Sequence, residues 1–124
     1  MFSSIAKKLG MDTGSLSVPK ITPQDAHQGV LSGDLILIDV REPNEWANTG
    51  CAENANPIAL QNENFVEEVL KLTGNNKSAS IAVCCKSGMR GDKAGKLLKA
   101  ADFTKVVNVE GGILRWISDK LPVK

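Results

Sequence analysis

The sequence predicts an α/β fold in which a mainly parallel central sheet carries helices on both faces. The first observation is a set of three short apolar runs: residues 35–40 (LILIDV), 80–84 (SIAVC) and 105–109 (KVVNV). Near-continuous apolar runs of this length are typical of strands that are buried on both faces, as in parallel sheets. The second observation is that helical patterns separate these runs. We therefore expect a three-layer domain with the sheet in the middle.

The first helix is predicted from its capping residues. Residues 22–25 (TPQD) place Thr22 at the N-cap, proline in the first turn and an acid three residues after the cap. We expect this helix to end at Gly29 or Gly33, because glycine commonly follows a helix C-terminus. Further along, residues 42–46 (EPNEW) open a short helix or turn.

Three later helices are predicted from apolar spacing and charge. Residues 62–72 repeat apolar positions, with acids early and a lysine late, as the helix dipole favours. A last helix is expected to start within residues 111–116. Between them, residues 90–101 carry apolar side chains at i, i+3, i+4 and i+7, which predicts a buried stripe of Ala94, Leu97, Leu98 and Ala101.

The length and charge fit a single domain. The chain has 124 residues and a net charge of +1, and so small a charge does not indicate binding to nucleic acid. No apolar run approaches the ~20 residues of a membrane span. We divide the chain into a leader at residues 1–19, either amphipathic or flexible, and a domain at residues 20–124. In an amphipathic leader, one helix face would hold Phe2, Ile5, Ala6 and Leu9.

The cysteines and the N-terminus bear on the cellular compartment. Three cysteines, two of them adjacent, make a poor disulfide framework. Residues 1–15 lack the sustained apolar stretch and the small-residue cleavage site of a secretory signal. We therefore expect free thiols in a reducing compartment and a cytoplasmic protein.

The loop that follows the second apolar run is the place where chemistry is expected. In parallel α/β folds, ligands bind outside the carboxyl ends of the strands, where loops lead into helices. Cys85 directly follows the strand at 80–84, and its loop leads into the helix at 90–101. Free N–H groups and the dipole at a helix N-terminus favour an anion, so the setting favours the thiolate of Cys85. Lys86 and Arg90 add positive charge on either side.

Cys84 is expected to play a different part from its neighbour. It belongs to the strand, so its side chain should point into a sheet face against a helix, where a free cysteine behaves as a small hydrophobe. A disulfide between Cys84 and Cys85 would be an off-state of the site.

Other conspicuous residues are interpreted as structural. Asp39 and Arg41 follow the first apolar run and would form an ion pair, with a glutamate nearby, that steadies the adjacent loops; direct help to the active site is the alternative. Gly111 and Gly112 are expected to form a turn with unusual φ that shapes one wall of the active loop. Packing or surface roles are expected for His27, Trp46 and Trp116.

Four stretches resemble, in the right order, the single-domain rhodaneses, a family of sulfurtransferases. They are LILIDVREPNEW, TGCAENANPI, CKSGMRGDKAGKLL and VNVEGGILRWISDKLPV, and the similarity covers residues 20–123. The third resembles the active-site loop and its helix, and the fourth resembles the C-terminal strand, Gly-Gly turn and tryptophan helix. The resemblance implies a rhodanese-like three-layer domain. Two residues depart from the family pattern: Cys51 stands where histidine is usual, and Gly91 replaces the serine or similar residue often found after the loop arginine.

The resemblance implies a ping-pong transfer of sulfane sulfur through Cys85. Its thiolate would take the outer sulfur of thiosulfate or a similar donor and release sulfite, and cyanide or a thiol would then attack the persulfide. Backbone N–H groups of the loop would stabilise the charged terminal sulfur. Neither a metal nor a cofactor beyond the covalent persulfide is expected. The substrate-binding residues implied in this way are Lys86, Ser87, Gly88, Met89 and Arg90.

Two other function classes stay open. One is a sulfur-carrier or regulatory module that passes the Cys85 persulfide to a protein partner. The other is a thiol-based phosphatase or arsenate reductase on a related fold, because fold alone does not decide function. Four residues separate Cys85 from Arg90, and cysteine-dependent phosphatases typically have one more. The shorter loop favours a single sulfur atom over a tetrahedral phosphate.

Overall fold

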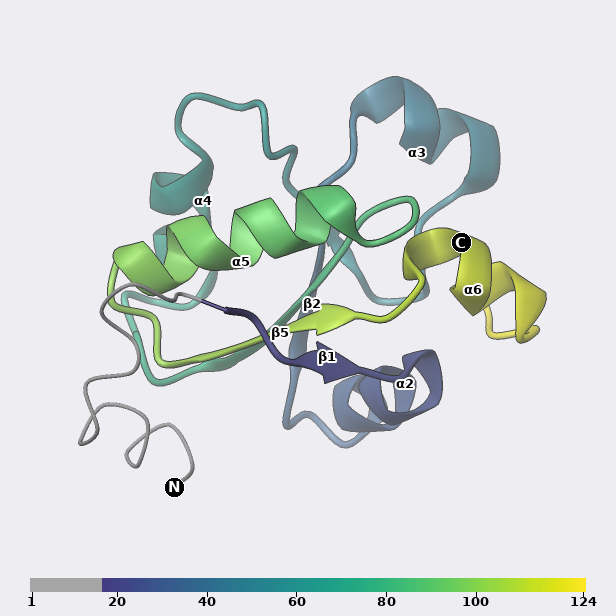
Figure 1. Ribbon diagram of the computed structural model, residues 1–124, viewed down its shortest axis with the longest axis horizontal. Coiled ribbons are helices and arrows are strands. Elements are labelled where there is room, and N and C mark those ends of the chain that lie inside the picture. The colour runs from purple at the N-terminus through teal and green to yellow at the C-terminus, as the bar shows by residue number, and fades with distance from the viewer. Residues whose placement is uncertain (1–16) are drawn as a thin grey trace.

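The computed structural model describes residues 17–124, so residues 1–16 of the predicted leader, expected to be either amphipathic or flexible, lie outside the described residues. Five strands form one parallel sheet in the order β1-β5-β4-β2-β3 (Figure 1). The strands are β1 (Lys20–Ile21), β2 (Ile36–Asp39), β3 (Asn56–Pro57), β4 (Ser80–Cys84) and β5 (Lys105–Val109). The helices are α2 (Pro23–Leu31), α3 (Pro43–Thr49), α4 (Phe65–Leu72), α5 (Met89–Ala100) and α6 (Gly112–Ser118). The predicted α/β fold with a parallel sheet is confirmed.

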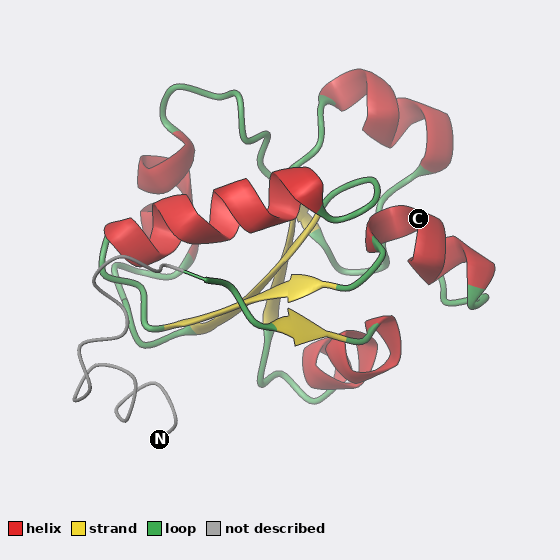
Figure 2. Ribbon diagram, in the orientation of Figure 1, coloured by secondary structure: helices red, strands yellow, loops and turns green. Residues whose placement is uncertain are grey.

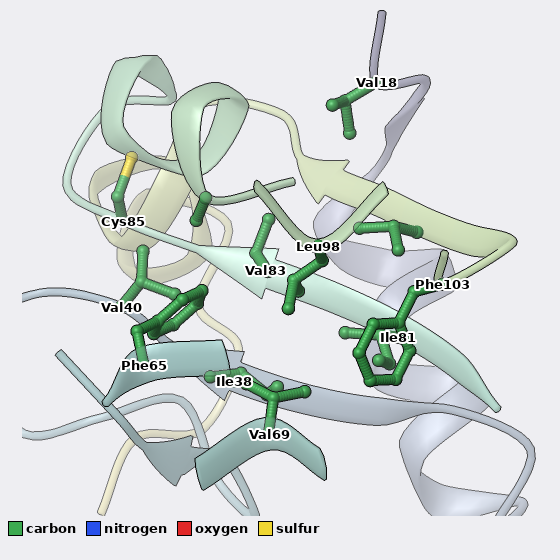
Figure 3. Close-up of a cluster of buried hydrophobic side chains, with 12 residues drawn as sticks. Val18, Ile38, Val40, Phe65, Val69, Ile81, Val83, Cys85, Leu98 and Phe103 are labelled. Atoms are coloured by element: carbon green, nitrogen blue, oxygen red, sulfur yellow. The ribbon is translucent and has the colours of Figure 1, made fainter. Parts of the chain in front are cut away.

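The helices cover both faces of the sheet, as Figure 2 shows. One buried cluster joins side chains of α4 and α5 to one face of β2, β4 and β5, and Figure 3 shows it between Val18 and Phe65. A second cluster joins α2 and α6 to the opposite face. Helix α3 contributes no buried residue. It follows β2 at the carboxyl edge of the sheet and so lies beside the loop that carries Cys85 (Figure 1).

The start of α2 confirms the predicted cap. The hydroxyl Oγ1 of Thr22 accepts a hydrogen bond from the N–H of Asp25 at 3.1 Å, and Pro23 begins the helix. The helix ends at Leu31, between the two glycines proposed as its end, and Gly33 has the left-handed φ of +82°. An N-cap bond of this kind stabilises a helix by about 1 kcal/mol.

The buried face of α5 differs from the predicted stripe. Leu97 is 42% exposed, so its assignment to the core was wrong. The buried residues are Gly91, Ala94, Gly95 and Leu98, which have the same spacing shifted by three positions towards the N-terminus. A Cβ at Gly95 would lie 2.8 Å from two methyl carbons of Val18, so the small residues let the helix lie close to its neighbours. The pattern of apolar side chains did not predict this face, because two of its four buried residues are glycines, which have no side chain.

The C-terminal helix is held by its tryptophan. Trp116 is fully buried, and its indole Nε1–H donates to the carbonyl oxygen of Pro122 at 2.8 Å. The ring of His27 lies edge-on to Trp116, with 5.6 Å between the ring centroids, so α2 and α6 are joined by an aromatic contact. The structural interpretation of both residues is confirmed, and Trp46 is half-buried.

Candidate active site

Cys85 directly follows β4, the middle strand of the sheet, and is 1% exposed. In Figure 3 its sulfur points away from Val40 and Phe65, at the end of the core cluster. Two N–H groups from the start of α6 hold its backbone: Ile113 N–H donates to the Cys85 carbonyl oxygen at 2.7 Å, and Leu114 N–H donates to that of Lys86 at 3.2 Å. The nucleophile is therefore fixed between β4 and α6.

Gly112 makes this arrangement possible. A Cβ at this position would overlap the carbonyl groups of Cys85 and Lys86, and the residue has a φ of +60°. Gly111 also has a left-handed φ, +76°. Only glycine adopts such angles at little cost, so the predicted Gly-Gly turn forms one wall of the loop.

One N–H group of the loop contacts the thiol. The N–H of Gly88 donates to the Sγ atom of Cys85 at 3.0 Å, and Gly88 has the unusual φ of +125°. Gly88 is also the N-cap of α5. Within residues 17–124, the remaining N–H groups of the loop make no hydrogen bond; they belong to Lys86, Ser87, Met89 and Arg90. Free donors at a helix start favour an anion at this position.

The side chains of the loop lie around its rim rather than over the sulfur. Lys86 and Ser87 are exposed, and Met89 is 84% exposed. Lys86 forms no ion pair within the described part of the chain. The charge of Lys86 is thus available to an incoming anion.

Arg90 turns away to a partner on α3. Its guanidinium donates from Nη1 to Oε1 of Glu45 at 2.6 Å and from Nη2 to Oε2 at 2.8 Å. Hydrogen bonding by Arg90 lowers the pKa of Glu45 from 4.5 to about 2, and the same bonds raise the pKa of Arg90. Glu45 also accepts from the N–H of Glu42 at 3.1 Å and so closes the capping box of α3. Sequence reasoning missed Glu45, whose only sign was an acid in the first turn of α3.

A second ion pair is buried beneath the site. Arg41 Nη2 lies 2.7 Å from Oδ2 of Asp39, and both side chains are 2% exposed or less. Arg41 further donates to Oγ1 of Thr49 and to the carbonyl oxygen of Gly50. Burial alone would lower the pKa of Arg41, but the hydrogen bonds and charge of Asp39 raise it. The pair ties β2 to the end of α3, as its structural interpretation requires, and no glutamate joins it within residues 17–124.

The other two thiols are protonated and poorly placed for chemistry. Cys84 is fully buried, as expected, and burial raises its pKa strongly. Its thiol donates to the carbonyl oxygen of Cys85 at 3.6 Å. Burial followed by the charge of Asp39 raises the pKa of Cys51 from 9.0 to about 11. Cys85 is therefore the candidate nucleophile.

A small pocket adjoins the loop between α3 and the start of α6. Its volume is about 90 Å³. This is the share of about three water molecules, which suits a small ion. The lining residues are Arg41, Glu45, Asn48, Thr49, Lys86, Ile113 and Leu114.

The fold and the loop define a class: a parallel α/β domain with a cysteine at the carboxyl end of its central strand and a helix start above it. The sequence model of the rhodanese-like domain matches residues 22–119, and the chain belongs to this family. Rhodanese-like domain-containing protein 17 of Arabidopsis thaliana is 30% identical over 125 residues, which cover 90% of this chain and 78% of that protein.

Solved structures agree with this assignment. The polysulfide-sulfur transferase homodimer of Wolinella succinogenes superposes with a TM-score of 0.71 and 27% identity, over 98% of this chain and 88% of that one. A rhodanese-related protein of Thermoplasma volcanium gives a TM-score of 0.66 and 28% identity, over 86% and 97% of the two chains. Together these comparisons support a sulfurtransferase-like family.

Residues 17–124 contain neither a candidate membrane span nor a candidate metal cluster. None of their helices combines the length and apolar character that crossing a bilayer requires. Nor do these residues bring three or more metal-ligating side chains together.

Proposed function

We propose that the protein is a sulfurtransferase that moves sulfane sulfur from thiosulfate or a similar donor to cyanide or a thiol, through a persulfide on Cys85. The observation that carries the proposal is the N–H of Gly88, 3.0 Å from the Cys85 sulfur, in a loop whose other N–H groups lack acceptors within residues 17–124. The similarity to a polysulfide-sulfur transferase supports this class of donor.

The first half-reaction forms the persulfide. The electron pair of the Cys85 thiolate forms a new bond to the outer sulfur of thiosulfate, and the S–S bond of the donor breaks with its pair leaving on sulfite. In the second half-reaction, cyanide attacks the terminal sulfur of the persulfide and leaves as thiocyanate, which restores the thiolate. A thiol acceptor takes the sulfur in the same way. Covalent catalysis splits one transfer into two easier steps.

The surroundings of Cys85 suit a reaction in which charge needs stabilising and protons need not move. Within residues 17–124, the single hydrogen bond to its sulfur comes from a backbone N–H, and no carboxylate or histidine bonds to it. Preorganised N–H donors stabilise a charged terminal sulfur as they stabilise an oxyanion. No metal and no cofactor beyond the persulfide enters this scheme.

Substrate binding is assigned to the residues around the rim of the loop. The pocket of about 90 Å³ beside Lys86 suits a small dianion, which the Lys86 ammonium would attract. We propose Lys86, Ser87, Gly88, Met89 and Arg90 as the substrate-binding loop, with Arg90 acting through its contact with Glu45. A protein thiol is the alternative acceptor, and the free thiols suit a cytoplasmic setting.

Intact mass spectrometry tests the proposal directly. After incubation with thiosulfate and removal of excess donor, the wild-type protein should gain the mass of one sulfur atom, and cyanide should remove it with release of thiocyanate. Cys85→Ser should gain nothing. A wild-type protein that stays unmodified at millimolar thiosulfate and polysulfide would refute the proposed function.

A further inference from the structure

A buried asparagine reaches the loop from the neighbouring strand. Asn108 lies in β5, pairs in register with Val83 of β4, and is 3% exposed. Apart from the Asp39–Arg41 pair, it is the only buried polar residue within residues 17–124. Its amide Nδ2 donates to the carbonyl oxygen of Gly88 at 2.9 Å. A buried amide in an apolar setting is costly unless it is hydrogen-bonded, so this contact fixes where the side chain lies.

The residue that Asn108 contacts, Gly88, is also the one whose N–H bonds to the Cys85 sulfur. Gly88 donates its N–H to the Cys85 Sγ atom at 3.0 Å, while its carbonyl oxygen accepts from both Asn108 and the N–H of Asp92. The two groups flank one Cα atom whose φ is +125°. Holding the carbonyl therefore restrains the direction of the N–H, and the sheet is coupled to the sulfur through a single residue.

Gly91 makes room for this amide. A Cβ at Gly91 would overlap Oδ1 of Asn108, and that oxygen is buried without a hydrogen-bond donor among residues 17–124. Any larger residue at position 91 must displace the Asn108 amide and with it the bond to Gly88. Gly91 is thus matched to the asparagine of β5.

We propose that Asn108 is a positioning residue for the sulfur-transfer loop, and that Gly91 is the partner it requires. Asn108 does not contact the sulfur. It keeps the N–H of Gly88 aimed at the Cys85 sulfur and at the terminal sulfur of a persulfide, so the loop does not have to reorganise when charge arrives. The effect on turnover rests on the proposed function, whereas the effect on the reactivity of the Cys85 thiol does not.

Asn108→Ala and Asn56→Ala form a matched pair for the test. Asn56 also donates its amide to a backbone carbonyl, that of Leu37 at 3.1 Å, but it lies on the edge strand β3. Two rates are measured at pH 7: iodoacetamide alkylation of Cys85, read from fragment ions that separate it from Cys84, and persulfide formation with thiosulfate. We expect Asn108→Ala to lower both rates about 10-fold, because a donor of the loop is no longer held in place. Asn56→Ala should leave both rates within about 2-fold, because β2 lies between β3 and β4 and the amide of Asn56 bonds to Leu37 rather than to the loop.

Gly91→Ala gives a second and independent variant, since it keeps the asparagine at position 108 and changes only the space around its amide. It should lower the same two rates, because the new methyl group pushes the amide off Gly88. The double variant Gly91→Ala/Asn108→Ala should be no slower than Asn108→Ala alone, since residues that act through one contact are not additive. Fully additive losses would contradict the coupling.

The outcomes separate this inference from the proposed function. A wild-type protein that forms no persulfide, but whose Cys85 alkylation still falls in Asn108→Ala and not in Asn56→Ala, would refute the sulfur transfer and keep the positioning role. Persulfide formation that proceeds equally in Asn108→Ala and wild type, with unchanged alkylation, would overturn the positioning role alone.

Discussion

Arg90 and Glu45, which are 45 residues apart in the sequence, meet through two charged hydrogen bonds of 2.6 and 2.8 Å. The contact joins the first turn of α5 to the first turn of α3, so the helix that follows the Cys85 loop is tied to the helix that follows β2. Both side chains are about one-quarter to one-third exposed. A bidentate, partly buried pair of this kind is stronger than the usual surface salt bridge.

Glu45→Gln should destabilise the protein in a pH-dependent way. The folded-state pKa of Glu45, about 2, lies below its ordinary value of 4.5. The pair therefore stabilises the fold above pH 4.5, and this contribution is lost as the pH falls towards 2. At pH 7 we expect the free energy of unfolding to drop by about 1 kcal/mol. Urea unfolding of both proteins from pH 7 to pH 2.5 measures the difference, which should shrink along the series.

Glu68→Gln is the control for this series. Glu68 lies 3.6 Å from Lys71 in an exposed pair, with 41% of its own side chain exposed, so its loss should change stability by well under 1 kcal/mol at every pH. Equal effects of the two substitutions would mean that the Arg90 contact adds nothing beyond an ordinary surface pair.

Cys85→Ser should abolish thiocyanate formation, and Cys84→Ser should retain most of it. The two side chains differ in position, since Cys85 accepts from the loop and Cys84 is enclosed in the sheet against α2 and α6. A serine hydroxyl at position 84 costs about 1–3 kcal/mol of stability if it is left unpaired. Steady-state assays with thiosulfate and cyanide, at a temperature where both variants are folded, make the comparison. Comparable loss of activity in the two would contradict the assignment of roles.

The thiols should react with iodoacetamide in a fixed order. Cys51, with a pKa of about 11, is almost entirely protonated at pH 8 and should react slowly. Cys84 should react only after unfolding, because it is enclosed between the sheet and helices α2 and α6 and its pKa is strongly raised, whereas the sulfur of Cys85 lies against the loop. We expect Cys85 to be modified first. Peptide mapping at successive times measures the order, and pretreatment with thiosulfate should delay modification at Cys85 alone. Early modification of Cys51 would show that its thiolate is more accessible than the structure indicates.

The loop should accept sulfur and reject phosphate. Four residues lie between Cys85 and Arg90, and the N–H of Gly88 already reaches the sulfur at 3.0 Å. We expect so short a loop to leave too little room for the three equatorial oxygens of a transferring phosphoryl group. We expect turnover of thiosulfate and no measurable hydrolysis of aryl phosphates or reduction of arsenate.

An insertion tests the same size argument. One glycine added after Gly88 should damage sulfur transfer, because it moves the N–H that contacts the sulfur. Phosphatase activity in the unmodified protein that disappears in Cys85→Ser would overturn this reasoning.

The sequence predicted the parts of the fold that leave a local pattern. Strands β4 and β5 lie at the predicted residues, because both are near-continuous apolar runs in the interior of the sheet. Strands β1 and β3 have two residues each and were missed, since two residues carry no periodicity. The predicted run at residues 35–40 is shortened to Ile36–Asp39.

For the candidate site, the sequence likewise predicted the local feature, the position of Cys85, and not the long-range contacts around it. The position of Cys85 after a buried strand could be inferred from the chain order alone. The contacts of Arg90 with Glu45 and of Asn108 with Gly88 join residues 45 and 20 positions apart. Only the packing of α3 and β5 against the loop brings these partners together, and no spacing rule along the chain encodes it.

The adjacent thiols of Cys84 and Cys85 lie on opposite faces of the sheet, which keeps them from forming a disulfide with each other. Cys84 packs in the cluster of α2 and α6, and Cys85 in the cluster of α4 and α5, so the strand itself separates the two sulfurs. A disulfide needs the two Cβ atoms close and facing each other, which would require the end of β4 to leave the sheet. If Cys85 carries a sulfur atom, as proposed above, the strand would keep that atom away from the adjacent Cys84 thiol until an acceptor arrives from solution.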